Sequence, residues 1–473
     1  MSIQTRTRPS LGIKARLLLP MKFPMPIVQA QLRMSEVISA LSYALDITEG
    51  QPPGHAVRSC LIGMRLAEEL GLDAQERSDL YYALLLKDAG CSSNAAKICS
   101  LFRSDDLRVK GGVKTVEWTS LSENFLWAVR NVAPESSPLG RAAALVRLGF
   151  KQGAQKDIFE TRCERGADIA SELGFPEAAA AAIRTLDEHW DGRGQPVGLQ
   201  GDEIPVLGRI VCLAQSLDVF LVTHGLEAAY RMARERSGTW FDPALVGALE
   251  TIEGDGHFWA GLAAGEFDGL VGGLEPMERV VRVDDAGLDR VASAFARVID
   301  AKSPFTARHS ERVAEIALGI GVVVGLGRDE LRRLNRAALL HDIGKLGISN
   351  LILDKPGRLT EDERVEIEQH PIYTWKLLSR VAAFSELARD ASDHHEKLDG
   401  SGYPSGVRGD ELSQTARILV VADIFEAMTA VRPYRDSLPI GHVLAVLEAE
   451  AGSKLDRDCV AALHSWVELA AAA

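Results

Sequence analysis

Residues 394–425 read HHEKLDGSGYPSGVRGDELSQTARILVVADIF, and an earlier stretch of the chain has the same layout. That stretch, residues 187–220, reads DEHWDGRGQPVGLQGDEIPVLGRIVCLAQSLDVF and aligns without gaps at an offset of 208. Identical residues at this offset include Asp191 and Asp399, Gly194 and Gly402, and Arg209 and Arg417. An internal repeat of this kind means that one supersecondary arrangement occurs twice in the fold.

Two shorter motifs upstream repeat as well, both at an offset of 254. GHAVRS, which contains His55, matches RHSERV, which contains His309. LLLKDAG, which contains Asp88, matches ALLHDIG, which contains Asp342. One offset kept across two separate motifs is hard to obtain by chance, so the chain contains two copies of one domain. We expect a flexible tail at 1–29, a first domain at 30–252, a glycine-rich linker at 253–282 and a second domain at 283–473.

Both halves are expected to be helical. The apolar residues Val313, Ile316 and Ile320 have helical spacing, and the composition contains only 6% aromatic residues, which favours helix over sheet. The segment DGSGYPSG (399–406) cannot continue a helix, because glycines and a proline make it a turn-rich loop. The sequence therefore predicts an all-α protein of two tandem helical bundles.

The overall composition narrows the class of protein. The net charge is −13 and the pI about 5.4, which argues against binding to a nucleic acid polymer or an anionic membrane. The six cysteines form no CxxC pair, so we expect a reduced, cytoplasmic protein without a disulfide framework. We also expect no membrane span, because the chain has no run of eighteen apolar residues.

Histidines and aspartates extend the apolar stripes of several predicted helices in the second half. They are His309, His341, Asp342, His370, His394, His395 and Asp423. A single histidine on such a face is more often an ordinary core residue, but burying seven ionisable groups without a partner is costly. A metal provides that partner, and imidazole with carboxylate suits Mn, Fe or Zn. The sequence thus predicts a metal site, and the lack of nearby cysteine argues against structural zinc.

Lys345 follows His341 by four residues and Asp342 by three, so it lies one helical turn along the same face. A lysine beside a metal site can bind a phosphate oxygen, whereas an isolated lysine at this position would be an ordinary solvated residue.

These residues resemble a known family. HDIGK (341–345), QHP (369–371), HHEKLDGSGYP (394–404), VADIFEAMTA (421–430) and RPYR (432–435) look like the HD-GYP domain, a branch of the HD phosphohydrolase superfamily. SPFTARHSERV (303–313) is similar to the opening motif of that family. The resemblance covers residues 285–460, in the family's order and spacing.

The resemblance implies hydrolysis of cyclic di-GMP to linear pGpG, with further hydrolysis to GMP left open. It implies a site of two iron or manganese ions held by the seven residues above, with Asp342 and Lys345 as catalytic residues. It also implies that Lys345, Tyr403, Arg432 and Arg435 bind substrate. Further partners that it suggests are GGDEF-type proteins, through the GYP loop, and a second copy of the chain.

Phe305 bears on the number of metals. Some family members carry a glutamate four residues before the first histidine, where it recruits a third ion, and this chain has Phe305 there. Two ions are therefore expected. They would lower the pKa of a shared water, and the resulting hydroxide would attack phosphorus. Two alternatives remain open: a hydrolase acting on another cyclic dinucleotide or nucleotide, and a signalling protein that binds nucleotide without turnover.

The first half keeps few of these residues. His55 and Asp88 match His309 and Asp342, but the other positions differ. Their replacements are Lys87 for His341, Cys91 for Lys345, Arg162 for His370 in a looser alignment, Leu186 and Asp187 for His394 and His395, Gln195 for Tyr403, and Gln215 for Asp423. His189 and His224 match no ligand and are expected to be ordinary polar residues. We therefore predict no metal pair in the first half, which would serve binding, dimerisation or regulation, or only support the second.

Overall fold

The computed structural model describes residues 32–116, 121–134, 136–150, 154–265, 270–276, 280–432 and 435–472. These residues form helices, turns and loops, and the only β pairing among them consists of isolated bridges. The predicted all-α class is therefore confirmed. The expected tail at 1–29 lies outside the described residues.

The first bundle contains α-helices and two 3-10 turns. They are α1 (Met34–Thr48), α2 (His55–Glu69), α3 (Ala74–Leu86), η1 (Cys91–Asn94), α4 (Ala95–Phe102), α5 (Asp106–Val113), α6 (Leu121–Asn131), α7 (Pro138–Phe150), α8 (Ala154–Glu172), α9 (Glu177–Arg184), η2 (Gly201–Glu203), α10 (Val206–His224), α11 (Leu226–Glu235) and α12 (Pro243–Thr251).

The second bundle repeats this order with fewer elements after its first 3-10 turn. They are α15 (Asp285–Asp300), α16 (His309–Val324), α17 (Arg328–Leu340), η4 (Ile343–Gly347), α18 (Asn350–Leu353), α19 (Glu361–Ile367), α20 (His370–Leu378), α21 (Ser385–Ser392), η5 (Gly409–Glu411), α22 (Gln414–Thr429), α23 (Ile440–Glu450) and α24 (Arg457–Ala472).

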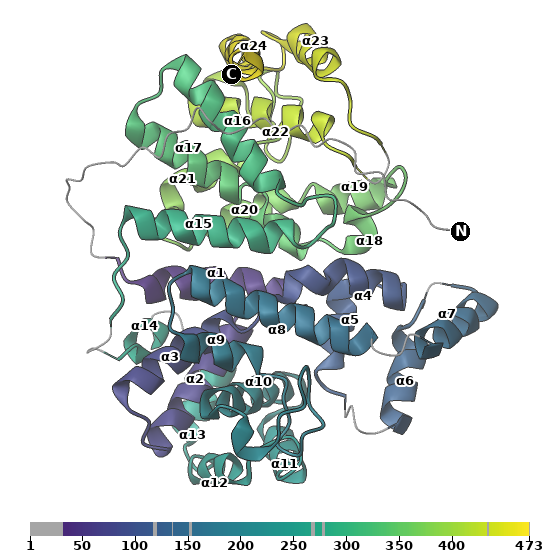
Figure 1. Ribbon diagram of the computed structural model, residues 1–473, viewed down its shortest axis with the longest axis vertical. Coiled ribbons are helices and arrows are strands. Elements are labelled where there is room, and N and C mark those ends of the chain that lie inside the picture. Colours follow the sequence, from purple (N-terminus) through teal and green to yellow (C-terminus); the bar gives the residue numbers. More distant parts are fainter. Residues whose placement is uncertain are drawn as a thin grey trace.

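The repeat seen in the sequence is a repeat of the structure. Helices α2 and α3 begin 254 residues before α16 and α17, and α9 and α10 begin 208 residues before α21 and α22. The fall from 254 to 208 means that the first half is 46 residues longer between η1 and α8. Helices α4 to α7 occupy this region, and α6 and α7 stand out at one side of the molecule (Figure 1).

The two halves pack against each other through equivalent elements. Helix α1 of the first half contacts η4 and α20 of the second, and α15 of the second half contacts η1 and α8 of the first. Both helices lie at the boundary between the halves (Figure 1). Because each contact has its counterpart, the halves are related by an approximate twofold arrangement. Most of their buried apolar side chains form one core that spans both halves, and a small separate cluster lies around Val132 and Ala144.

Part of the expected linker is folded. Residues 253–282 contain α13 (Gly256–Ala264) and α14 (Leu270–Leu274), and α14 contacts α1 and α2. Glu275 is buried and accepts hydrogen bonds from Ser35 Oγ (2.8 Å) and Tyr82 Oη (2.5 Å). This part of the segment therefore belongs to the first bundle.

Of the described helices, α10 is long and apolar enough to cross a bilayer. However, 61% of its apolar window is buried inside the first bundle, which is the ordinary state of a core helix. It packs against α2, α9 and α11.

Candidate metal centre

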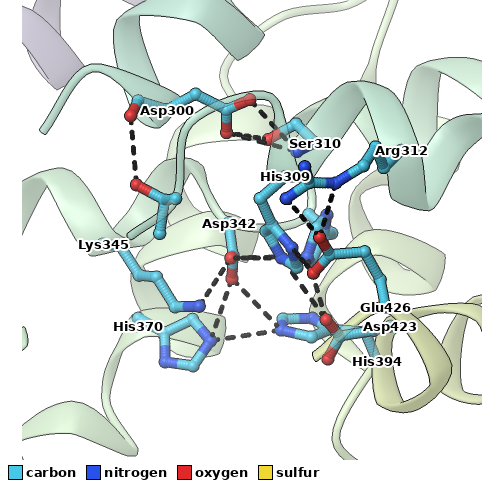
Figure 2. Close-up of polar contacts among 12 residues, drawn as sticks. Asp300, His309, Ser310, Arg312, Asp342, Lys345, His370, His394, Asp423 and Glu426 are labelled. Carbon is cyan, nitrogen blue, oxygen red and sulfur yellow. Dashed lines mark hydrogen bonds and ion pairs between the residues drawn. The ribbon is translucent and has the colours of Figure 1, made fainter. Parts of the chain in front are cut away.

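The seven predicted ligands meet at one point of the second bundle, and most of them stand at helix ends. His309 is the first residue of α16, and His370 is the first residue of α20. His341 and Asp342 follow the last turn of α17, His394 and His395 follow α21, and Asp423 lies within α22. Figure 2 labels His309, Asp342, His370, His394 and Asp423 and shows them converging. Their nitrogen and oxygen atoms fall into three groups, each with atoms within 4.8 Å of one another.

Backbone and side-chain acceptors hold the imidazole rings in one orientation. The Nδ1 atoms of His341, His370 and His394 lie 2.7, 2.6 and 2.6 Å from carbonyl oxygens one turn earlier. His309 Nδ1 lies 2.5 Å from a carboxylate oxygen of Glu426. Because a carbonyl can only accept, Nδ1 donates and the Nε2 lone pair points to the centre, which is the tautomer that metal ligands use.

Asp342 lies between the two halves of the cluster. Its Oδ2 atom is 3.3 Å from His309 Nε2 and 3.4 Å from His341 Nε2. Its Oδ1 atom is 3.4 Å from His370 Nε2 and 3.6 Å from His394 Nε2. One carboxylate thus offers one oxygen to each of two pairs of histidines.

The cluster contains lone pairs that no hydrogen-bond donor of the described residues satisfies. His370 Nε2 and His394 Nε2 lie 3.1 Å apart, and since both rings donate through Nδ1, two lone pairs face each other. His341 Nε2 and Asp342 Oδ1 are buried and have no hydrogen-bond partner within the described part of the chain. Buried polar atoms in this state are costly, and a divalent cation would satisfy them. The residues present therefore fit a metal.

Burial and charge favour the protonation states that metal binding needs at His341, His370 and Asp342, whereas hydrogen bonds to three carboxylates outweigh burial at His309 and raise its pKa well above the usual value. Burial lowers the pKa of His341 to about 4 and lowers the pKa of His370 as well, so both rings stay neutral. Burial alone would raise the pKa of Asp342, but its interaction with His341 and the positive charge of Lys345 hold it well below its usual range. Neutral imidazoles and an ionised carboxylate are the forms that bind metal.

Glu426 is a site residue that the sequence reasoning missed. It is buried, and besides the bond to His309 it accepts from Arg312 Nε at 2.7 Å and Arg432 Nη2 at 3.1 Å. The repeat contained the signal: Asp218 stands 208 residues earlier and accepts from His55 Nδ1 (2.6 Å) and Arg58 Nε (2.6 Å). An acidic residue at the same place in both copies indicates a partner for the first histidine.

A cavity of about 270 Å³ opens beside the cluster, and several of the predicted substrate-binding residues line it. Lys345 lines it and lies 2.5 Å from Asp342 Oδ2. Tyr403 packs its ring 4.7 Å from that of His395, and Arg432 and Phe305 also face the cavity. Arg435 points elsewhere and donates to the carbonyls of residues 427 and 428 at the end of α22, so its contact with substrate stays a prediction.

The GYP loop is held by a buried glutamate that both copies retain. Glu396 accepts from the backbone N–H groups of Ser405 (2.7 Å) and Gly406 (3.1 Å). In the first half, Glu188 accepts from Val197 (2.7 Å) and its two successors. The loop thus keeps its support in both halves, although Gln195 has replaced the tyrosine.

In the first half, side-chain cations stand where the second half gathers metal ligands. Lys87 pairs with Asp88, and Lys114 lies 3.0 Å from Glu49 and 3.4 Å from Asp88. Burial alone would raise the pKa of Glu49, but Lys114 lowers it to about 2. Although Glu49, Asp88 and Cys91 offer three atoms close together, Lys114 already pairs with the two carboxylates. The absence of a metal pair in the first half stays a prediction.

The looser alignment of Arg162 with His370 has a structural counterpart. A Cβ atom on Gly344 would lie 1.9 Å from the carbonyl oxygen of His370, and one on Gly90 would lie 1.9 Å from that of Arg162. The two glycines are 254 residues apart and allow the same close approach. Arg162 therefore occupies the place of His370, and it pairs there with Asp187.

Comparison with known proteins agrees with this geometry. The profile of the HD domain matches residues 153–245 and 293–459, and so reaches into both halves. Over 447 residues the chain is 46% identical to the 3'3'-cGAMP-specific phosphodiesterase 3 of Vibrio cholerae, which covers 94% of this chain and 97% of that protein. The chain belongs to the HD-domain family, in its HD-GYP branch.

A response regulator and a solved structure are also similar to this chain. A cyclic di-GMP phosphodiesterase response regulator of Xanthomonas campestris is 33% identical over 291 residues, which cover 53% of this chain and 76% of that protein. A crystal structure of a cyclic GMP-AMP specific phosphodiesterase of V. cholerae matches with a TM-score of 0.64 at 41% identity, over 92% of this chain and 98% of the other. The family predicted from the sequence motifs is thus confirmed.

Proposed function

We propose that this HD-GYP protein is a metal-dependent phosphodiesterase that hydrolyses 3'3'-cGAMP. The observation that carries the reaction class is Asp342, whose two oxygens face two separate groups of histidines in a buried cluster. The substrate rests on the V. cholerae relative, which is described as 3'3'-cGAMP-specific and is similar along both halves of the chain.

Two metal ions would be held by the seven clustered residues. Iron and manganese are the proposed metals, because the donors are imidazole and carboxylate without thiolate. When bound, such ions lower the pKa of a coordinated water and stabilise negative charge on phosphoryl oxygens.

Side chains of the protein would bind the substrate and orient the ligands. Lys345 extends along the cavity wall with its ammonium group beside Asp342, where it can bind a phosphoryl oxygen as charge develops. Tyr403 and Arg432 line the same cavity, and they offer a ring for stacking on a base and a guanidinium for a phosphate. Glu426 acts through His309, whose ring it orients.

Cyclic di-GMP is the second candidate substrate. It is favoured by the intact motif Gly402–Tyr403–Pro404 and by the cyclic di-GMP phosphodiesterases among the relatives. Those similarities cover 53% and 33% of the chain, against 94% for the 3'3'-cGAMP enzyme, so we place cyclic di-GMP second.

The test uses the full chain, loaded anaerobically with Mn or Fe, and incubated separately with 3'3'-cGAMP and cyclic di-GMP. We expect linear products, and a larger kcat/KM for 3'3'-cGAMP. Faster hydrolysis of cyclic di-GMP would reverse the order of the substrates. Binding of either nucleotide without any product, under both metals, would favour a signalling protein and end the catalytic proposal.

The repeat provides a matched pair of variants. Asp342→Asn should lower turnover by about 100-fold or more, because a shared ligand is lost. Asp88→Asn makes the same change at the equivalent position of the first half and should leave turnover within about twofold of the parent. Equal losses in both variants would contradict the assignment of the site to the second half.

A further inference from the structure

A second cavity, of about 420 Å³, lies in the first half at the place where the second half has its catalytic cavity. Glu49 and Arg162 line it, and Ser303 and His370, their counterparts at offsets of 254 and 208, line the catalytic cavity. The first half has therefore kept a cavity at the position of the site although it has lost the ligands.

The walls of this cavity are apolar and come largely from the 46 additional residues. Helices α4, α5, α6 and α7 contribute side chains, and α8 closes one side; they include Ile98, Phe102, Val109, Leu145, Leu148 and Phe159. A volume of roughly 300–1,000 Å³ with mostly apolar walls is typical of sites for small molecules. The second half has only the short helices α18 and α19 in this region.

One end of the cavity is polar, and its charges are already paired. Glu49 faces Lys114, and Arg162 pairs with Asp187. Lys110 donates to the carbonyls of Thr48 (3.1 Å) and Cys91 (2.8 Å) and lies 3.6 Å from Asp106. A ligand with a charged head group would find no free opposite charge here, and moving its charge out of water would therefore be costly.

Two polar atoms of residues that line the cavity lack a partner. Arg162 Nε, a donor, and Asn94 Oδ1, an acceptor, are both buried and make no hydrogen bond to any residue that the structure describes. Asn94 is 3% exposed and Arg162 is 8% exposed, and both line the cavity. Unsatisfied buried groups of this kind are uncommon and call for a partner.

We propose that the cavity binds an uncharged amphipathic molecule whose head group both accepts and donates a hydrogen bond, as a primary amide does, and whose acyl chain lies along the apolar walls. The head accepts from Arg162 Nε–H and donates to Asn94 Oδ1. This inference is independent of the proposed phosphodiesterase activity, because it uses only residues of the first half.

The experiment measures binding of decanamide to the full chain by calorimetry. Decanoate and decyltrimethylammonium serve as comparison ligands that have a hydrocarbon tail of the same length and a charged head group. We expect saturable binding of decanamide and binding of the charged probes at least about tenfold weaker. No saturable binding of decanamide, or tighter binding of a charged probe, would overturn the proposal.

Variants locate the site. Ala128 and Leu145 line the cavity, so Ala128→Trp and Leu145→Trp should each abolish binding by filling it. The controls Leu126→Trp and Val146→Trp change neighbours that are 50% and 59% exposed, and they should bind as the parent does. Asn94→Leu should weaken the binding of decanamide at least tenfold, because the acceptor oxygen is lost. Folding of each variant is checked by thermal melting; parent-like binding in a folded cavity-filling variant would refute the location.

Discussion

Replacing Glu426 by glutamine tests whether the metal centre depends on the orientation of its first histidine. The carboxylate accepts from His309 Nδ1 at 2.5 Å and from Arg312 through Nε at 2.7 Å and Nη2 at 2.6 Å. The glutamine amide has the same shape but only one acceptor oxygen, so its N–H₂ group must face either His309 or Arg312. Both neighbours donate a hydrogen bond to the carboxylate, and neither donor can pair with an N–H₂ group. The ring of His309 then loses its fixed tautomer or its ion-paired support.

The expected magnitude follows from the role of the residue. Loss of an outer partner of a metal-bound histidine costs about 10- to 100-fold in metal affinity or activity. We therefore expect Glu426→Gln to bind Mn or Fe about 10- to 100-fold more weakly, and to lose hydrolysis at limiting metal while recovering part of it at high metal. Equilibrium dialysis with elemental analysis measures the affinity, and product separation measures the rate.

Asp218→Asn is the matched control, because Asp218 makes the same contacts with His55 and Arg58 in the first half. It should lower the free energy of unfolding by an amount similar to that in Glu426→Gln, yet leave metal affinity unchanged. If Glu426→Gln kept the parent's metal affinity, or if both variants lost metal equally, the reasoning about the histidine tautomer would be refuted.

Three further predictions concern Lys345, Lys302 and a pair of glycines. Lys345→Ala should lower kcat by about 100-fold while both metals stay bound, and parent-like kcat would exclude a role at phosphate. Burial lowers the pKa of Lys302 to about 8 from 10.5, so unfolding takes up a proton between these pH values and stability rises with pH across that window. Lys302→Met should remove this rise, worth roughly 3 kcal/mol, in denaturant titrations at a series of pH values; parallel curves for variant and parent would contradict it. Gly344→Ala and Gly90→Ala each place a Cβ 1.9 Å from a backbone oxygen, and each should cost about 3 kcal/mol in denaturant unfolding, but only Gly344→Ala should lower metal content. Equal metal loss in both glycine variants would count against a centre confined to the second half.

Much of the architecture could be predicted from the sequence because the repeat constrains it. Two offsets, 254 and 208, place equivalent helices in both halves and bring His309 into line with His55. The cluster could be predicted because its members extend the apolar stripes of helices, where a buried histidine needs a partner. Helix periodicity and the motif order together carried this information.

Other features depend on contacts that no single stretch of sequence encodes. Glu426 lies three residues beyond Asp423 on α22, and its partner His309 is 117 residues away. The folded part of the expected linker was missed because its glycines suggested a connector, whereas Trp259 and Glu275 are buried against the first bundle. The apolar cavity arises only when α4 to α8 come together.

The most direct test of the central claim is to count and locate the metal ions in the full chain. Elemental analysis after anaerobic loading, followed by anomalous diffraction at the metal edge, gives both quantities. We predict two ions per chain, on either side of Asp342, with no ion near Glu49 and Asp88. A single ion, or an ion bound among Glu49, Asp88 and Cys91, would contradict the account.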